Sequence, residues 1–292
     1  MADTASTSSH PLTVAEGAVI DEEEVARARA RRRDRIARWV LPVLMMVLSL
    51  CGWQWLVVAN DIPHYILPKP TLIFETLIKD WPILGSALLV TLQITFGALA
   101  IAVVGGVGLA ILFSLSKWVE MSFFPYAIIL QVTPIIVIAP LIFIYVDSKI
   151  AGLLICAWIV AFFPILSNTS LGLNSADHNL QNLMELYGAS RWQTLWYLQL
   201  PTALPFFLAG LKIAGGLSLI GAIVAEFVAG TGGVGSGLAF RILESSYRLN
   251  IPRMFAAIIL ISFTGIVIFA AMSLLSHLLL RKWHESAIKR EN

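Results

Sequence analysis

The stretch of this sequence that most resembles a site for chemistry is rich in glycine. Gly230-Thr-Gly232-Gly-Val-Gly235 matches the pattern G-x-G-x-x-G. In dinucleotide-binding domains such a loop follows a buried strand and opens a helix, so that backbone N–H groups hold the phosphates. Here the stretch follows a long apolar run instead of a strand. We therefore interpret its glycines as residues that let the backbone turn and approach a neighbour closely, and we expect no dinucleotide.

Other common catalytic and metal-binding patterns do not occur in the sequence. It has no G-x-x-x-x-G-K-[ST] phosphate loop, no H-E-x-x-H and no C-x-x-C, and its five histidines are scattered. Cys51 and Cys156 both lie inside apolar runs, where we expect small core residues. We predict no metal site, no cofactor and no nucleotide hydrolysis by this chain.

One acidic residue, Glu226, lies near the end of an apolar run in Ala225-Glu226-Phe227. An acid inside a membrane span is a candidate functional group. Two interpretations stay open: a carboxylate within the membrane, or one at the membrane surface paired with a base such as Arg241 or Arg248. Other ionisable groups are nearly absent from the apolar runs. This disfavours a transporter driven by protons or sodium, which needs relays of such groups or ion sites in broken helices.

The composition indicates a protein that crosses the membrane several times. Of its 292 residues, 58% are hydrophobic and 13% are charged, against about 45–50% and about 25% in soluble domains. Six apolar runs approach or exceed the roughly 20 residues that a spanning helix needs. They are residues 39–59, 84–114, 121–146, 149–171, 204–229 and 253–280. The third run contains Pro125, Pro134 and Pro140, and we expect it to be kinked and to lie inside the bundle.

Basic residues predict the orientation, because they concentrate on the cytoplasmic side of membrane proteins. With the N-terminus in the cytoplasm, fourteen of the 20 Lys and Arg residues lie on that side, and six spans return the C-terminus to it. We expect residues 1–35 to form a disordered cytoplasmic tail that fixes the topology or binds anionic lipid. Residues 36–285 would form the transmembrane domain and residues 286–292 a short cytoplasmic tail.

Small residues are dense in the second and fifth apolar runs, and such stripes allow helices to approach closely. For the second run we expect packing within the chain. For the fifth, packing within the chain and dimerisation both stay open.

Between the fourth and fifth runs, residues 175–200 have the pattern of two short helices at an angle on the cytoplasmic side. Leu180, Leu183, Met184 and Tyr187 recur at helical spacing, which predicts an amphipathic helix. Ser175 or Asp177 would cap its start, and Gly188 suits the left-handed position after its end. Ser190-x-x-Gln193 then forms a capping box for a second helix, and we expect Pro201 to end that helix.

This stretch resembles the EAA signature of permease subunits in bacterial ABC importers that use a separate substrate-binding protein. The signature is E-A-A-x-x-x-G, nine further residues and I-x-L-P. The matching positions here are Gly188, Leu198, Leu200 and Pro201. The position of the signature glutamate is Asn182, and Glu185 follows three residues later. Whether Glu185 takes over the contacts of that glutamate stays open.

Further stretches resemble the subfamily that imports nitrate, sulfonates, taurine and also pyrimidine vitamin precursors. They are Leu67-Pro-Lys-Pro70, Val224-Ala-Glu226 and the glycine-rich stretch after it. The resemblance implies an all-α membrane protein of six transmembrane helices with the type I ABC importer permease fold. Both termini would be cytoplasmic, and the protein would lie in the bacterial inner membrane as a homodimer.

The resemblance also implies partners and contact residues. The partners are cytosolic ATP-binding subunits, a periplasmic or extracellular binding protein, a second permease copy and membrane lipid, with no nucleic acid. Residues 175–200 would be the coupling helices that bind the ATP-binding subunit. The contact residues would be Asn182, Glu185, Leu186, Gly188, Ala189, Ser190, Arg191, Leu200 and Pro201.

We therefore predict a permease subunit of an ATP-driven importer rather than an enzyme. Its pathway would be lined by Gln131, Thr133, Pro134, Ser218 and Glu226. The predicted substrate is a small organic or inorganic anion such as a sulfonate, taurine or nitrate. Four alternatives stay open: a pyrimidine or vitamin precursor, an aromatic acid, a secondary transporter or channel acting alone, and a membrane-anchored sensor or scaffold subunit.

Overall fold

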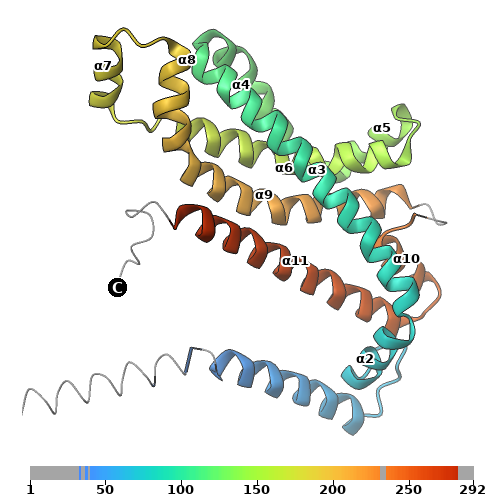
Figure 1. Ribbon diagram of the computed structural model, residues 1–292. Coiled ribbons are helices and arrows are strands. Elements are labelled where there is room, and N and C mark those ends of the chain that lie inside the picture. The colour runs from blue at the N-terminus through green and yellow to red at the C-terminus, as the bar shows by residue number, and fades with distance from the viewer. Residues whose placement is uncertain (1–32, 34–36, 39, 231–234, 282–292) are drawn as a thin grey trace, which may run out of the picture. The chain divides into compact units, whose positions relative to one another are not determined.

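The computed structural model describes Arg33 and residues 37–38, 40–230 and 235–281 (Figure 1). Apart from Arg33, the expected tails at residues 1–35 and 286–292 lie outside the described residues, as do residues 231–234 of the glycine-rich stretch. The chain divides into a unit up to Pro63 and a second unit from His64 onward. The first unit contains an apolar helix, Val40–Ala59, long enough to cross a membrane.

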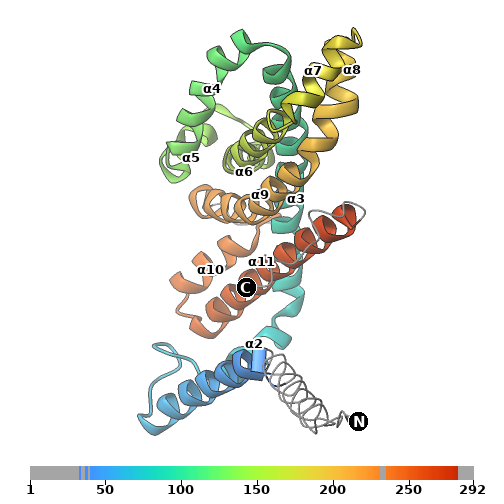
Figure 2. The same cartoon turned by 90° about the vertical axis from the view of Figure 1, so that its left-hand side faces the viewer.

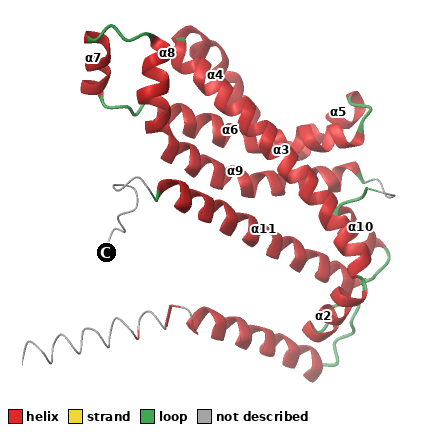
Figure 3. Cartoon of the chain, viewed as in Figure 1, coloured by secondary structure: helices red, strands yellow, loops and turns green. Residues whose placement is uncertain are grey.

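The second unit is built of helices and loops in its described residues, without strands (Figure 3). Four of its helices are long and apolar enough to span a membrane, and a bent pair, α4 and α5, adds a candidate span. With Val40–Ala59 this gives the six expected spans. The elements are α2 Pro70–Lys79, α3 Trp81–Leu115, α4 Lys117–Val132, α5 Ile135–Tyr145, α6 Lys149–Leu173, α7 His178–Leu186, α8 Arg191–Thr194, the π-helix η1 Leu195–Gln199, α9 Leu200–Ala229, α10 Leu238–Tyr247 and α11 Ile251–Leu280.

The core of this unit forms where α6 packs against α3 on one side and α9 on the other (Figures 1 and 2). Small residues make the contact with α9 close. A Cβ atom added at Gly221 would lie 2.8 Å from the Cα of Ala157, and one at Gly210 would lie 2.7 Å from the carbonyl oxygen of Pro164. These glycines of the fifth apolar run therefore serve packing within the chain. Gly216, on the same helix, has no atom within 4 Å of such a Cβ.

The third apolar run folds as two helices bent by 103° rather than as one kinked helix. Pro134 has no N–H group to continue α4, and the residue before a proline is pushed into extended conformation, as Thr133 is at ψ 123°. The expectation that this run lies inside the bundle is not met within a single chain. Val132 is 73% exposed, and α4 and α5 each bury one alanine. This apolar surface is open to lipid or to another copy of the chain.

We predict that Gly221→Ala lowers the thermal stability of the purified protein, although alanine favours helix more than glycine does. The added methyl group would force the backbones of α6 and α9 apart, and overpacking of this kind costs roughly 1–3 kcal/mol. The matched control is Gly108→Ala on α3, where an added Cβ meets nothing within 4 Å. Melting in detergent, followed by size-exclusion chromatography after heating, should show a lower midpoint for Gly221→Ala alone. Equal midpoints would contradict the packing argument.

Candidate functional site

The segment from α7 to η1 lies at one end of the second unit and joins α6 to α9 (Figure 1). The Asp177 carboxylate accepts a hydrogen bond from the Asn179 N–H at 2.7 Å and so caps the start of α7. Of the two caps that the sequence offered, the structure uses this one. Asp177 thereby fixes the point at which the chain turns from α6 into α7.

Gly188 ends α7 in the left-handed conformation, at φ 67°, as the sequence predicted. The Gly188 N–H donates to the carbonyl oxygen of Glu185, and the Ala189 N–H donates to that of Met184, both at 2.9 Å. This pair of bonds is a Schellman motif, which satisfies carbonyl groups that the end of a helix leaves free. The turn after α7 is therefore defined by its backbone.

The predicted capping box is confirmed at the start of α8. The Gln193 N–H donates to Ser190 Oγ at 3.3 Å, and the Ser190 N–H donates to Gln193 Oε1 at 2.7 Å. Two N–H groups of the helix terminus are satisfied reciprocally, which holds α8 at a fixed angle to the preceding turn.

The expectation that Pro201 ends this second helix was wrong. Pro201 lies in the first turn of α9, and the chain runs from Arg191 to Ala229 as one helical segment of 39 residues. A proline at this place removes a hydrogen bond to the preceding turn. The π-helical turn η1, Leu195–Gln199, ends two residues before it, and the Leu200 N–H closes the wider ring by donating to the carbonyl oxygen of Leu195.

Contacts with the end of α3 attach this segment to the core. The Arg191 guanidinium donates to the carbonyl oxygen of Leu115 at 3.0 Å, and Ser114 Oγ donates to Gln199 Oε1 at 2.9 Å. Leu195 is buried and is itself part of the core. Ser114, Leu115 and Gln199 were not predicted from the sequence. The available signal was general: the last carbonyl groups of α3 need donors, and a basic side chain suits a helix C-terminus.

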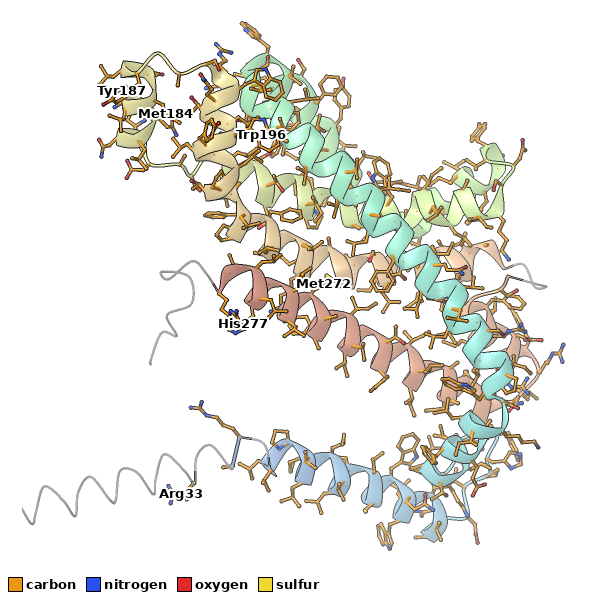
Figure 4. The ribbon with its side chains drawn as sticks, in the orientation of Figure 1. Arg33, Met184, Tyr187, Trp196, Met272 and His277 are labelled. Atoms are coloured by element: carbon orange, nitrogen blue, oxygen red, sulfur yellow. The ribbon has the colours of Figure 1, made fainter. Side chains whose placement is uncertain are left out.

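The apolar face of α7 is only partly covered in the described chain, since Leu180 and Leu183 are 47% and 46% exposed. No residue of α7 is buried, and Leu186 and Tyr187 are 85% and 83% exposed. Figure 4 shows Met184 and Tyr187 on α7 and Trp196 on the neighbouring segment. Trp192, Trp196 and Tyr197 are also mostly exposed. Exposed apolar and aromatic side chains concentrated on one segment are typical of a site of interaction with another molecule.

The two candidates for the signature carboxylate differ in their surroundings. Asn182 and Glu185 are both exposed on α7. Glu185 also borders a polar pocket of about 260 Å³ between α7, α8 and the end of α3, and Asn182 does not. The pocket is lined by Ser114, Leu115, Gln181, Glu185, Ala189, Arg191, Thr194 and Gln199.

Three of the five expected pathway residues lie together at the bend between α4 and α5. Gln131, Thr133 and Pro134 line a pocket of about 280 Å³, whose other lining residues are apolar and include Leu217 of α9. Ser218 follows Leu217 but is fully buried and donates to the carbonyl oxygen of Gly215. Gln131, Thr133 and Pro134 are therefore grouped, whereas Ser218 is not part of that lining.

Glu226 is 3% exposed and lies away from this pocket, against α3 and the start of α10. Its carboxyl group accepts hydrogen bonds from the Thr91 hydroxyl at 2.8 Å and from the Ala239 N–H at 2.9 Å. The bases considered as its partners, Arg241 and Arg248, instead pair with Glu244 at 2.8 and 3.1 Å. Thus Glu226 is a buried carboxylate within a span, bonded to neutral donors.

Comparison with known proteins places this arrangement in a family. The profile described as "Binding-protein-dependent transport system inner membrane component" matches residues 102–281. The riboflavin transport system permease protein RibX of Chloroflexus aurantiacus is 31% identical over 89% of this chain and 96% of its own. The formylaminopyrimidine transport permease protein ThiX of Halalkalibacterium halodurans is 31% identical over 82% of this chain and 94% of its own. Relatives of lower identity bear the names of permeases for aliphatic sulfonates, nitrate and taurine.

A solved structure shares the fold. A chain from the "Crystal structure of an amino acid ABC transporter with histidines" superposes with a TM-score of 0.57, covering 72% of this chain and 98% of its own, at 23% identity. The profile match extends from the middle of α3 to the end of α11, and so includes the whole segment from α7 to η1. The chain therefore belongs to the inner membrane components of binding-protein-dependent transport systems, the permease subunits of ABC importers.

Proposed function

We propose that the exposed face of α7 and α8 binds a cytosolic ATP-binding subunit, whose cycle drives import through a pair of these permease chains. The observation that carries this proposal is an apolar, aromatic-rich surface on a segment whose backbone is fixed at both ends. Such a surface suits a groove in a partner, because an amphipathic helix in a groove presents anchors at helical spacing. The proposed contact residues are Asn182, Glu185, Leu186, Gly188, Ala189, Ser190 and Arg191.

Leu200 and Pro201 act differently in this proposal. They lie in the first turn of α9 and are partly buried. They therefore carry movement of the docking segment into the membrane helix. A partner drives a change only if it binds two states with different affinity. ATP provides that difference on the partner, so the permease needs a rigid connection here and no chemistry of its own.

The proposed orientation puts α7 and both termini in the cytoplasm, in accord with the positive-inside rule. The opposite end of the unit, with α2 and α10, then faces the substrate-binding protein. A second copy of the chain would cover the open apolar surface of α4 and α5, and the pathway would run between the copies. Gln131, Thr133 and Pro134 are its proposed lining, and Ser218 and Glu226 would join it only in another state of α9.

For the substrate we propose a small, mostly neutral nitrogen heterocycle in preference to the anion that the sequence suggested. No Lys or Arg lines the pocket at the bend, and Gln131 and Thr133 offer neutral hydrogen-bonding groups. The relatives RibX and ThiX, at 31% identity, bear the names of riboflavin and formylaminopyrimidine permeases. A sulfonate or nitrate remains the second candidate, since relatives of lower identity are named for these anions.

Gly188→Val is predicted to uncouple the complex without preventing membrane insertion. A β-branched residue in the left-handed region is strained by roughly 1–2 kcal/mol, which would open the Schellman turn. An added Cβ would meet nothing within 4 Å, so the effect is conformational and not a clash. Gly188→Asn is the matched control, because asparagine tolerates this conformation. ATPase activity stimulated by the binding protein should fall about tenfold in the valine variant only; normal stimulation in both variants would contradict the assignment.

Glu185→Ala is predicted to weaken assembly with the ATP-binding subunit more than Asn182→Ala does. Glu185 borders the polar pocket that contains Arg191, whereas Asn182 does not. Co-purification of a tagged ATP-binding subunit from membranes measures the effect, with the level of each variant in the membrane as the control. If Asn182→Ala fails to co-purify the ATP-binding subunit while Glu185→Ala co-purifies it fully, Glu185 has not taken over the contacts of the signature glutamate.

The substrate proposal is tested on the binding protein that works with this permease. We predict that riboflavin or a formylaminopyrimidine raises its melting temperature and that taurine, an alkanesulfonate and nitrate do not. The opposite result would select the anion class. Uptake into liposomes that contain the permease without ATP-binding subunits would instead support a transporter acting alone.

A further inference from the structure

A hydrogen-bonded group joins three helices at the end of α9 that is far from α7. Thr91 of α3 donates its hydroxyl hydrogen to Glu226 Oε1 of α9 at 2.8 Å. The other carboxylate oxygen, Oε2, accepts the backbone N–H of Ala239 at 2.9 Å, and Thr91 Oγ1 accepts that of Leu238 at 2.9 Å. All four residues are at most 3% exposed. Figures 1 and 2 show α10 beside these two helices.

These bonds cap α10 from outside its own sequence. The first N–H groups of a helix have no partner within it, and Gly237, at the N-cap position, supplies no side-chain acceptor. Thr91 and Glu226 supply the acceptors in its place. A carboxylate at this point is also favoured by the partial positive charge of a helix N-terminus. The start of α10 is thus held by α3 and α9 together.

Gly237 shows how closely the carboxylate is seated. A Cβ atom added at this position would collide with the carboxyl group of Glu226. The φ of Gly237 is −84°, which other residues adopt readily, so the steric contact and not the backbone requires a glycine. The absence of a side chain at 237 is what gives the carboxylate access to the Ala239 N–H.

The helical segment that ends near Glu226 begins at the proposed docking surface. It runs without interruption from Arg191, beside the capping box, to Ala229. At about 1.5 Å per residue, its length is about 58 Å. The segment contains the π-helical turn η1 and Pro205, and it continues as helix through both. A shift of its first turn can therefore be passed along one continuous backbone to its last turn, beside α10.

We propose that Glu226, with Thr91, is a positioning residue that fixes α10 to the ends of α9 and α3, so that movement of the α7–α8 segment reaches α10 as movement of one rigid body. That α10 is held in place follows from the hydrogen bonds of Thr91 and Glu226 alone. The transmission rests on the proposed function, because it requires the ATP-binding subunit to act on α7. Glu226 would then serve transport by holding α10, without touching the substrate in this state.

The first experiment tests the fixing of α10 on the purified permease alone. Thr91→Val keeps the shape of the side chain but removes the hydroxyl that serves both Glu226 and the Leu238 N–H. Thr91→Ser keeps the hydroxyl. Thr95→Val is the matched control, because Thr95 is equally buried one turn along α3 but donates only to the carbonyl oxygen of Thr91. Hydrogen exchange of a peptide covering residues 237–247 reports on the start of α10.

We expect exchange in this peptide to be about tenfold faster in Thr91→Val than in the native chain, since a buried N–H loses its partner. Thr91→Ser and Thr95→Val should exchange at the native rate. Glu226→Ala should resemble Thr91→Val. Equal exchange in Thr91→Val and Thr95→Val would overturn the fixing, as would faster exchange spread evenly over all helices.

The second experiment tests transmission in the complex with ATP-binding subunits. A cysteine replaces Tyr247, which is 82% exposed at the end of α10, in a chain in which Cys51 and Cys156 are replaced by alanine. Its rate of reaction with a maleimide is compared with and without MgATP and vanadate. We expect MgATP and vanadate to change this reaction rate in the otherwise native chain and in Thr95→Val. In Thr91→Val the rate should be the same with and without them. Unchanged behaviour of Thr91→Val would overturn the transmission.

Failure of the proposed function gives a different result. If the ATP-binding subunits do not bind the native chain, the coupling assignment of α7 is wrong and the transmission falls with it. The exchange measurement on the permease alone still decides whether Glu226 and Thr91 hold α10.

Discussion

The close approach of α6 to α9 is the constraint on which the rest of the second unit depends. In a membrane, hydrophobic burial does not distinguish a neighbouring helix from lipid, so helices associate through close packing and hydrogen bonds. Here the packing requires bare backbone at Gly210 and Gly221, against Pro164 and Ala157 of α6. Because α6 also packs against α3, it sets the positions of α3 and α9. These two helices hold the α7–η1 segment at one end of the unit and α10 at the other.

At both ends, hydrogen bonds attach α3 to the long segment Arg191–Ala229, through different residues. At one end, Arg191 and Gln199 form hydrogen bonds with Leu115 and Ser114, the last residues of α3, and these bonds attach the proposed docking segment to the core. At the other end, Thr91 near the start of α3 meets Glu226 and α10. Helix α3 therefore contacts the long segment Arg191–Ala229 near both of its ends. In the proposal made above, these contacts at both ends make α7–α8 and Glu226 parts of one body that moves together.

Local features were predictable from the sequence and distant ones were not. The spans, the turn at Gly188 and the capping box at Ser190 follow from residues within one or two turns of each other. The bond between Thr91 and Glu226 joins residues 135 positions apart, and that between Arg191 and Leu115 joins residues 76 apart. No spacing rule points to such pairs. Pro201 misled the prediction because a proline at the start of a helix and one at its end look alike unless the π-helical turn before it is known.

The turn η1 has a consequence for how this protein can vary. A π-helical turn contains one residue more than an α-helical turn would need at that place. Removing one residue from Leu195–Gln199 would restore an ordinary helix, and everything before it would rotate by about 100° relative to α9. Trp192 and the apolar face of α7 would then point in a different direction relative to α9. The direction in which this permease presents its proposed partner surface thus depends on the number of residues in η1 as well as on the identity of the side chains, and deletion of one residue would change that direction.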